Sequence, residues 1–294
     1  MERLTHYYQW KEIPETEMER YFAQFRDCGW HRLVLSSNLL DRIMDEPAFL
    51  LRLMRLAEKY ELSFPDAHGI WGAALGLGTG GRFPSLIAPM IEAHKRAMAY
   101  CADMGCKTYT VHMGAYEHIY FGTPASVYKE LAAKALEKLI PEAEKLGLVM
   151  ALENNCDNPG SADALLPLFE TFRSPNFGCC FDTGHAHYLT PARGREVFSY
   201  ESGITLDFCT DPLKKLLPHI VTVHMHDTDR TGDWHRMPGK GEINWSELIP
   251  TLDKAPRLIS WQSEVETGDY MISIPELITE FQKLLTLKER SFYV

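Results

Sequence analysis

The feature that most constrains the fold of this chain is a repeated alternation of short β-type runs with helical stretches. The candidate strands are eight segments, at 3–8, 31–36, 62–67, 107–113, 147–153, 177–182, 219–225 and 257–264. Helical periodicity is clearest over 47–60, 85–104, 126–146, 161–172, 246–253 and 275–287. Strands that alternate with helices must be joined by crossovers, so they pair in parallel. The sequence therefore predicts an α/β fold with one parallel sheet.

Closure of that sheet into a (β/α)8 TIM barrel is the economical arrangement, because eight strand–helix units fill the 294 residues. An open doubly wound sheet is the alternative, but no G-x-G-x-x-G motif follows the first strand. The sequence contains no linker or low-complexity tract that would divide it. We therefore expect residues 1–294 to form a single barrel domain.

Composition limits the compartment and the partners. The formal net charge of −10 argues against a protein that holds nucleic acid by bulk electrostatics. The seven cysteines include no C-x-x-C pair, which argues against a disulfide framework or a cysteine zinc site. No apolar run is long enough to span a membrane, and the first residues lack the apolar segment of a signal peptide. We expect a cytoplasmic protein with reduced thiols, and a homo-oligomer is left open.

Six consecutive candidate strands end in a residue that can bind a metal or transfer a proton. These residues are His68, His112, Glu153, Asp182, His224 and Glu264, and His185 follows Asp182 by three positions. The carboxyl ends of all strands lie at one end of a TIM barrel, where the active sites of this fold are built. The sequence therefore predicts that these side chains meet in one site.

Three carboxylates and one imidazole, from Glu153, Asp182, His224 and Glu264, form a donor set suited to Mn²⁺, Mg²⁺, Co²⁺ or Zn²⁺. Such an ion polarises a substrate oxygen, and carboxylates beside it can exchange a proton with a substrate carbon. These are the requirements of aldose–ketose isomerisation, or of epimerisation next to a ketone.

The chain resembles the xylose isomerase-like TIM barrels, a superfamily that includes sugar isomerases, ketose 3-epimerases and endonuclease IV. The resemblance covers nearly the whole chain. It depends on five motifs, at 152–155 (Leu-Glu-Asn-Asn), 181–185 (Phe-Asp-Thr-Gly-His), 223–227 (Val-His-Met-His-Asp), 238–245 (Pro-Gly-Lys-Gly-Glu-Ile-Asn-Trp) and 263–266 (Ser-Glu-Val-Glu). It implies a metal-dependent isomerase or epimerase of a small sugar, polyol or keto-sugar, which acts by proton transfer next to a carbonyl through an enediolate.

The resemblance also assigns roles to residues. It implies that Glu153, Asp182, His224 and Glu264 bind the metal and that the two glutamates form the acid–base pair. Resemblance to the ketose 3-epimerases implies that His185 and Arg230 hold substrate oxygens. His112 and Trp71 are further candidates for substrate contact, with Trp71 and Phe83 expected to form an apolar wall.

An endonuclease IV-like function is the alternative. Resemblance to that branch, which binds three zinc ions, places a second or third ion on His68, His112, His185, Asp233 and His235. An abasic-site phosphodiesterase therefore stays open, although residues 154–156 (Asn-Asn-Cys) depart from the endonuclease pattern. A third hypothesis is a barrel that binds a sugar or a metal without catalysis.

Overall fold

A computed structural model describes residues 3–72, 74–78, 84–114, 124–190, 206 and 208–287. Its strands form a closed barrel in which each strand pairs in parallel with the next, and β8 pairs with β1. The strands are β1 (Leu4–His6), β2 (Arg32–Leu35), β3 (Ser63–His68), β4 (Thr108–Val111), β5 (Val149–Glu153), β6 (Phe177–Asp182), β7 (Ile220–Met225) and β8 (Ser260–Ser263). Each coincides with one of the eight expected segments, so the predicted (β/α)8 barrel is confirmed.

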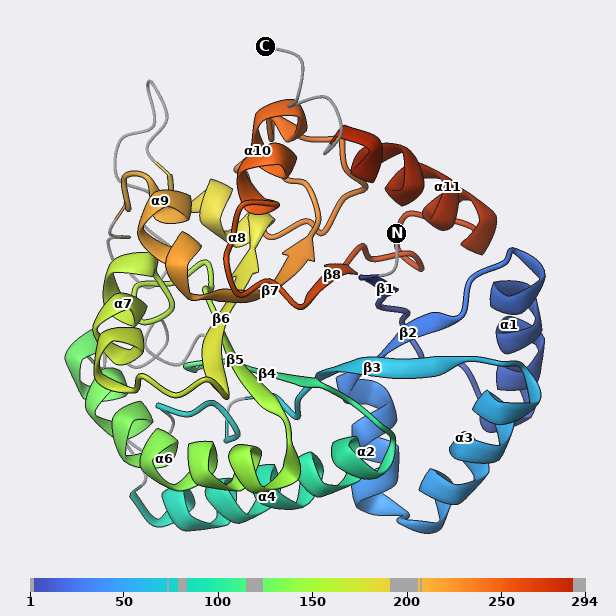
Figure 1. Cartoon of the computed structure of the whole chain (residues 1–294), viewed down its shortest axis with the longest axis horizontal. Helices are drawn as coiled ribbons and strands as arrows, with labels where there is room; N and C mark the ends of the chain where they lie inside the picture. Colours follow the sequence, from blue (N-terminus) through green and yellow to red (C-terminus); the bar gives the residue numbers. More distant parts are fainter. Residues whose placement is uncertain are drawn as a thin grey trace.

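Helices surround the strands on the outside of the barrel (Figure 1). The longer ones are α1 (Glu15–Asp27), α2 (Ser37–Asp45), α3 (Ala48–Lys59), α4 (Ile87–Asp103), α6 (Ala125–Leu146), α7 (Ala162–Thr171), α10 (Trp245–Leu252) and α11 (Ile274–Leu285). Shorter ones are η1 (Pro84–Leu86), α8 (Thr183–Tyr188), α9 (Pro212–Leu216) and η2 (Leu217–His219). Within the described residues, none of them is both long and apolar enough to cross a membrane.

The helix ends follow from local chemistry. Gly147 directly follows α6 with a φ of 69°, and Gly105 lies two positions after α4 with a φ of 85°. Only glycine adopts this left-handed conformation without strain, so these residues end the two helices and turn the chain into β5 and β4. Ser161 begins α7 by accepting a hydrogen bond from the backbone N–H of Ala164.

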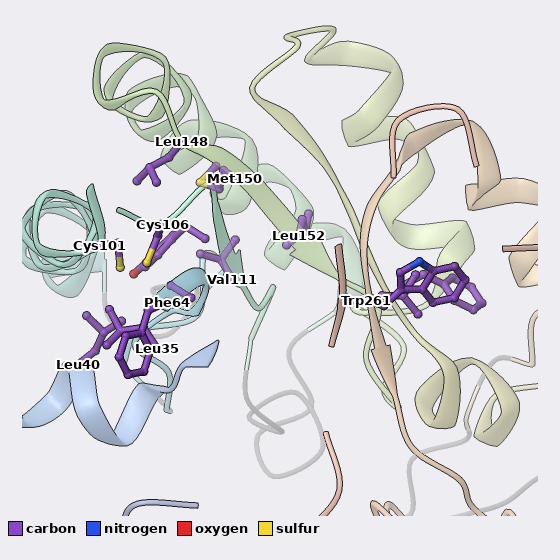
Figure 2. Packing of buried hydrophobic residues seen from close by; sticks show 14 of the residues in the cluster. Leu35, Leu40, Phe64, Cys101, Cys106, Val111, Leu148, Met150, Leu152 and Trp261 are labelled. Atoms are coloured by element: carbon purple, nitrogen blue, oxygen red, sulfur yellow. The ribbon is translucent and has the colours of Figure 1, made fainter. Parts of the chain in front are cut away.

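The hydrophobic core fills the layer between strands and helices. Figure 2 shows part of this cluster, with Leu40 from α2, Phe64 from β3 and Cys101 from α4. On α1, the buried side chains Met18, Phe22 and Phe25 recur at helical spacing. Burial of these apolar side chains is the main force that holds the helices against the barrel.

The inside of the barrel contains a polar layer centred on Asp66 of β3. Its carboxylate accepts hydrogen bonds from Thr5 (2.9 Å), Thr108 (2.6 Å) and Ser260 (2.7 Å), which lie on β1, β4 and β8. Thr222 of β7 joins the layer through a 2.9 Å contact with the Ser260 hydroxyl. Burial raises the pKa of Asp66, although the hydroxyl donors oppose the shift. These hydrogen bonds stabilise the Asp66 carboxylate, which would be costly to bury without partners.

Candidate metal centre

The four residues expected to bind one metal lie at the carboxyl ends of neighbouring strands. Glu153 and Asp182 end β5 and β6, His224 is the penultimate residue of β7, and Glu264 directly follows β8. All four are buried, and one donor atom from each lies within 4.8 Å of the others. We call these residues the glutamate cluster.

The centre of the glutamate cluster is Nδ1 of His224. It lies 2.8 Å from Oε2 of Glu264 and 3.2 Å from Oε2 of Glu153. Neither ring nitrogen of His224 makes a hydrogen bond of acceptable geometry to any described residue. A buried imidazole that converges with two carboxylates without hydrogen bonds fits the ligand shell of a divalent cation.

Asp182 is held by the start of α8 and by Asn154, which directly follows β5. Its carboxylate caps α8 by accepting the backbone N–H of His185 at 2.7 Å. The Asn154 side chain accepts the Asp182 backbone N–H at 2.9 Å and donates to the Asp182 carbonyl at 3.0 Å. These contacts fix the backbone from which the carboxylate projects, as is typical of residues behind a metal ligand.

Two histidines expected at a second ion lie against the same glutamate. Nε2 of His112 is 3.1 Å from Oε2 of Glu153, and Nε2 of His68 is 3.9 Å from the same atom. Donor atoms of His68, Glu153 and His224 lie within 4.8 Å of one another. Glu153 therefore has the position of a carboxylate that two cations could share.

A third group of candidate metal ligands lies beside the glutamate cluster and the group formed by His68, Glu153 and His224. Nε2 of His185 and Nε2 of His235 each lie 3.2 Å from Oδ1 of Asp233. Donor atoms of these three residues, together with one from His226, fall within 4.8 Å of one another. We call His185, Asp233 and His235 the loop cluster, because two of its members lie in the loop after β7.

Asp227 anchors that loop. Its buried carboxylate accepts hydrogen bonds from the backbone N–H of Gly239 (2.7 Å) and Ile243 (3.2 Å), and from the indole N–H of Trp245 (2.8 Å). Its backbone exchanges two hydrogen bonds with Arg236. The loop between these contacts carries Asp233 and His235, so Asp227 fixes where they are presented.

The pKa values of the two glutamates in the glutamate cluster are shifted towards the charged form. Burial alone would raise the pKa of Glu264, but His224 lowers it to about 2. Burial alone would likewise raise the pKa of Glu153, but His224 and His112 hold it well below its ordinary value. The glutamates are therefore carboxylates at neutral pH, the form that binds a cation.

The histidines of the site differ in the direction of their pKa shifts. Burial and the neighbouring His112 lower the pKa of His68 to about 4. Burial alone would also lower the pKa of His235, but Asp233 raises it to about 10. Burial opposes protonation of His224 as well, yet the Cys180 thiol and the two glutamates raise its pKa well above its ordinary value. Protonated imidazoles thus balance the carboxylates in the metal-free protein.

A cavity of about 270 Å³ opens onto these clusters. Eight of the predicted site residues line it, namely His68, Trp71, His112, Glu153, His185, Asp233, His235 and Glu264. Asp182 and His224 are not among its lining residues and are almost fully buried. The cavity and the candidate cation ligands therefore lie together.

Arg230 lies apart from this cavity. Its Nε donates to Nε2 of His187 at 2.8 Å, and it lines a neighbouring cavity of about 600 Å³. Arg230 has a φ of 63°, a left-handed conformation that directs the chain differently from an extended strand end. The structure thus places Arg230 at a different cavity from the one lined by His185, the residue with which it was expected to hold substrate oxygens.

Trp71 lies at the rim of the cavity, where it is 49% exposed. Its ring centroid is 6.0 Å from that of His112, and its indole N–H donates to the Ser37 hydroxyl at 3.2 Å. Trp71 therefore forms an aromatic wall of the cavity, and its hydrogen bond to Ser37 orients the ring. Phe83, expected in the same wall, lies outside the described residues.

The structure adds Tyr7, Gln9, Val265 and Glu266 to the lining of the cavity. Asn155, which the sequence offers as a residue that contacts substrate or orients Glu153, lines it as well. Tyr7 directly follows β1, so the rule that sites form at strand ends would have found it if applied to the first strand. Burial raises the pKa of Glu266 to about 7.

Comparisons with known proteins agree with this architecture. A family model described as the xylose isomerase-like TIM barrel matches residues 52–280. A D-tagatose 3-epimerase-like protein is similar in structure, with a TM-score of 0.74, 18% identity, and coverage of 98% of this chain and 99% of that one. The IOLI protein with a bound zinc atom has a TM-score of 0.72 at 16% identity, with 99% of this chain and 100% of that chain covered.

A curated relative, an uncharacterised protein of Methanocaldococcus jannaschii named MJ1311, is 24% identical over 166 residues. The match covers 55% of this chain and 52% of that protein, so it spans about half the length of each. The family model, in contrast, covers most of the barrel, from α3 to α11. From the closed barrel and this match, the chain belongs to the xylose isomerase-like TIM barrel family.

Proposed function

We propose that this protein is a divalent metal-dependent isomerase or epimerase of a small sugar. The observation that carries the proposal is the convergence of Glu153 and Glu264 on one imidazole nitrogen of His224, at 3.2 and 2.8 Å. Both carboxylates also line the cavity, so they face the space in which a substrate would lie. The similarity in fold to a D-tagatose 3-epimerase-like protein supports the same class of reaction.

The glutamate cluster would hold the ion, and the ion would supply electrostatic stabilisation of negative charge on substrate oxygens. Glu153 and Glu264 accept and return the proton of a carbon next to the substrate carbonyl. Because both are carboxylates at neutral pH, either can act as the base. Epimerisation requires one glutamate to remove the proton and the other, after taking a proton from solvent, to deliver it to the opposite face of the same carbon. Delivery of the proton to the neighbouring carbon instead gives isomerisation.

Other residues of this chain would position the substrate. His112 and His185 line the cavity on either side of Glu153, with ring nitrogens 3.1 and 3.4 Å from its carboxylate. Trp71 offers an aromatic face at the rim. A cavity of about 270 Å³ suits a small molecule rather than a polymer. We also propose that residues 1–294 act as one domain, because pairing of β1 with β8 closes the barrel.

Deuterium exchange tests the proposal. A panel of aldoses and ketoses is incubated with the Mn²⁺-loaded protein in D₂O, and deuterium at the carbon next to the carbonyl is followed by NMR. We expect incorporation with the wild type and none with Glu153→Gln or Glu264→Gln. Glu92→Gln, on the exposed surface of α4, is the matched control and should exchange at the wild-type rate.

Wild-type exchange by either site variant would refute the acid–base assignment. Stabilisation of the protein by a sugar, with no exchange from any sugar in the panel, would instead support the non-catalytic barrel.

A second candidate is a phosphodiesterase that uses several zinc ions on abasic DNA. The specific observation in its favour is that seven of the nine expected ligands, including all of the loop cluster, line the same cavity, and the other two, Asp182 and His224, belong to the glutamate cluster. The net charge of −10 does not favour a DNA substrate. Three tightly held zinc ions per chain, together with cleavage of an abasic duplex, would establish this function in place of the first.

A further inference from the structure

His226 is a buried histidine beside the cation ligands that the proposed chemistry does not use. It lies just after β7 and its side chain is fully buried. Its Nε2 is 2.9 Å from Oδ1 of Asp182 and 3.0 Å from Oδ2. An imidazole N–H so placed donates to the carboxylate between its two oxygens. His226 therefore sets the rotation of a side chain in the glutamate cluster.

The same ring packs against the loop cluster. It stacks on the His235 ring with centroids 3.7 Å apart and an angle of 11° between the planes. It also meets the His185 ring edge-on, at 5.5 Å and 77°. One side chain thus contacts one member of the glutamate cluster and two members of the loop cluster.

The chain leaves a slot for this ring directly after Asp182. A Cβ added to Gly184 would lie 2.1 Å from Cε1 and 2.5 Å from Nδ1 of His226, which no side chain permits. Thr183 fixes the backbone of His226, donating from its hydroxyl to the carbonyl at 2.8 Å and accepting the N–H at 3.2 Å. Three successive residues, Asp182 to Gly184, therefore hold or make room for His226.

We propose that His226 is a positioning residue that couples the two cation sites. By donating to Asp182 and supporting the face of His235, it keeps a ligand of each cluster in the orientation that binds an ion. Partners of this kind commonly change metal affinity by about 10–100-fold when they are removed. The inference depends on the cation-binding part of the proposed function, and not on the sugar chemistry.

Substitution of His226 separates this role from direct ligation. In His226→Gln, the side-chain amide can still donate to Asp182 from near the original Nε2 position. In His226→Met, a side chain of similar length donates nothing. His94→Gln is the matched control, because His94 is equally buried but binds Tyr109 and a backbone carbonyl instead of a cluster member.

Cobalt binding is measured on the metal-free full-length proteins by equilibrium dialysis and by the visible absorption of the bound Co²⁺. We expect His226→Met to bind Co²⁺ about 10–100-fold more weakly, with altered absorption bands. His226→Gln should stay within about threefold of the wild type, and His94→Gln should be unchanged. Circular dichroism and thermal melting of the metal-free variants show whether each is folded.

Each result decides a different point. Wild-type binding by folded His226→Met would overturn the positioning role. Equal impairment of His226→Gln and His226→Met would overturn it in favour of direct ligation by the imidazole. Equal impairment of His94→Gln would attribute the effect to general loss of stability. Failure of the wild type to bind Co²⁺ at all would instead refute the metal-dependent function.

Discussion

Binding of a divalent cation to the metal-free protein should release protons at neutral pH. Ligation requires a neutral imidazole, whereas the raised pKa values of three histidines in the site favour the protonated form when no cation is bound. Burial opposes that proton in each case, but nearby acidic groups, which for His224 include the Cys180 thiol, hold the pKa of His185 and His224 well above the ordinary value and that of His235 at about 10. A cation must displace these protons to bind.

The same pKa shifts predict how many protons are released. The glutamates contribute none, because the pKa of Glu264 is about 2 and that of Glu153 is well below its ordinary value. His68, with a pKa of about 4, is already neutral. Filling the glutamate cluster should therefore release about one proton, and filling the loop cluster about two more.

The affinity of the site for a cation should increase as pH increases. The raised pKa values of the histidines favour the protonated form that has no cation bound, so protons compete with the cation. Below the raised pKa of His224, affinity at the glutamate cluster should increase about tenfold per pH unit, because one proton is displaced.

Isothermal titration with Zn²⁺, in two buffers of different ionisation enthalpy at pH 7, measures the released protons directly. His235→Asn should lower the total by about one, and His31→Gln, at an exposed site before β2, should leave it unchanged. Binding without proton release, or an affinity that is constant between about pH 6 and pH 8, would refute the electrostatic account of the site.

Three further variants test separate parts of the structure. Gly184→Ala places a methyl group 2.1 Å from the His226 ring, so thermal denaturation should show a loss of about 1–3 kcal/mol, and wild-type stability would contradict the packing described. Asp227→Asn removes an acceptor from buried donors that include Trp245, and urea denaturation should show a loss of about 1–3 kcal/mol. Trp71→Ala should raise KM for the sugar by about 3–10-fold while leaving the metal content unchanged, and an unchanged KM would remove Trp71 from the substrate site.

The sequence was sufficient to predict the barrel, because the strand–helix alternation is a property of the whole chain rather than of one segment. It did not single out α1, although Met18, Phe22 and Phe25 recur there at helical spacing and are buried. The same rule that placed Glu153 and Glu264 at strand ends holds in the structure, since closure of a barrel brings all the carboxyl ends of its strands together.

What the sequence could not give was the direction of individual side chains in the loops. Arg230 has the spacing of a substrate-binding residue, yet its left-handed backbone and its contact with His187 place it at another cavity. His226 could not be distinguished from a ligand by spacing, because its role depends on a carboxylate from another strand. The roles of the site residues, the cytoplasmic location and the oligomeric state stay predictions.

The polar layer around Asp66 has a consequence for redesign of this barrel. Its donors come from β1, β4 and β8, so a shift of one residue in any of these strands would turn a hydroxyl outwards and leave the carboxylate without that partner. Strand alignment is therefore specified inside the barrel, independently of the loops that follow the strands. Loops at the carboxyl ends can be exchanged to alter substrate preference without realigning the strands, provided that Asp66 and its hydroxyl partners are retained.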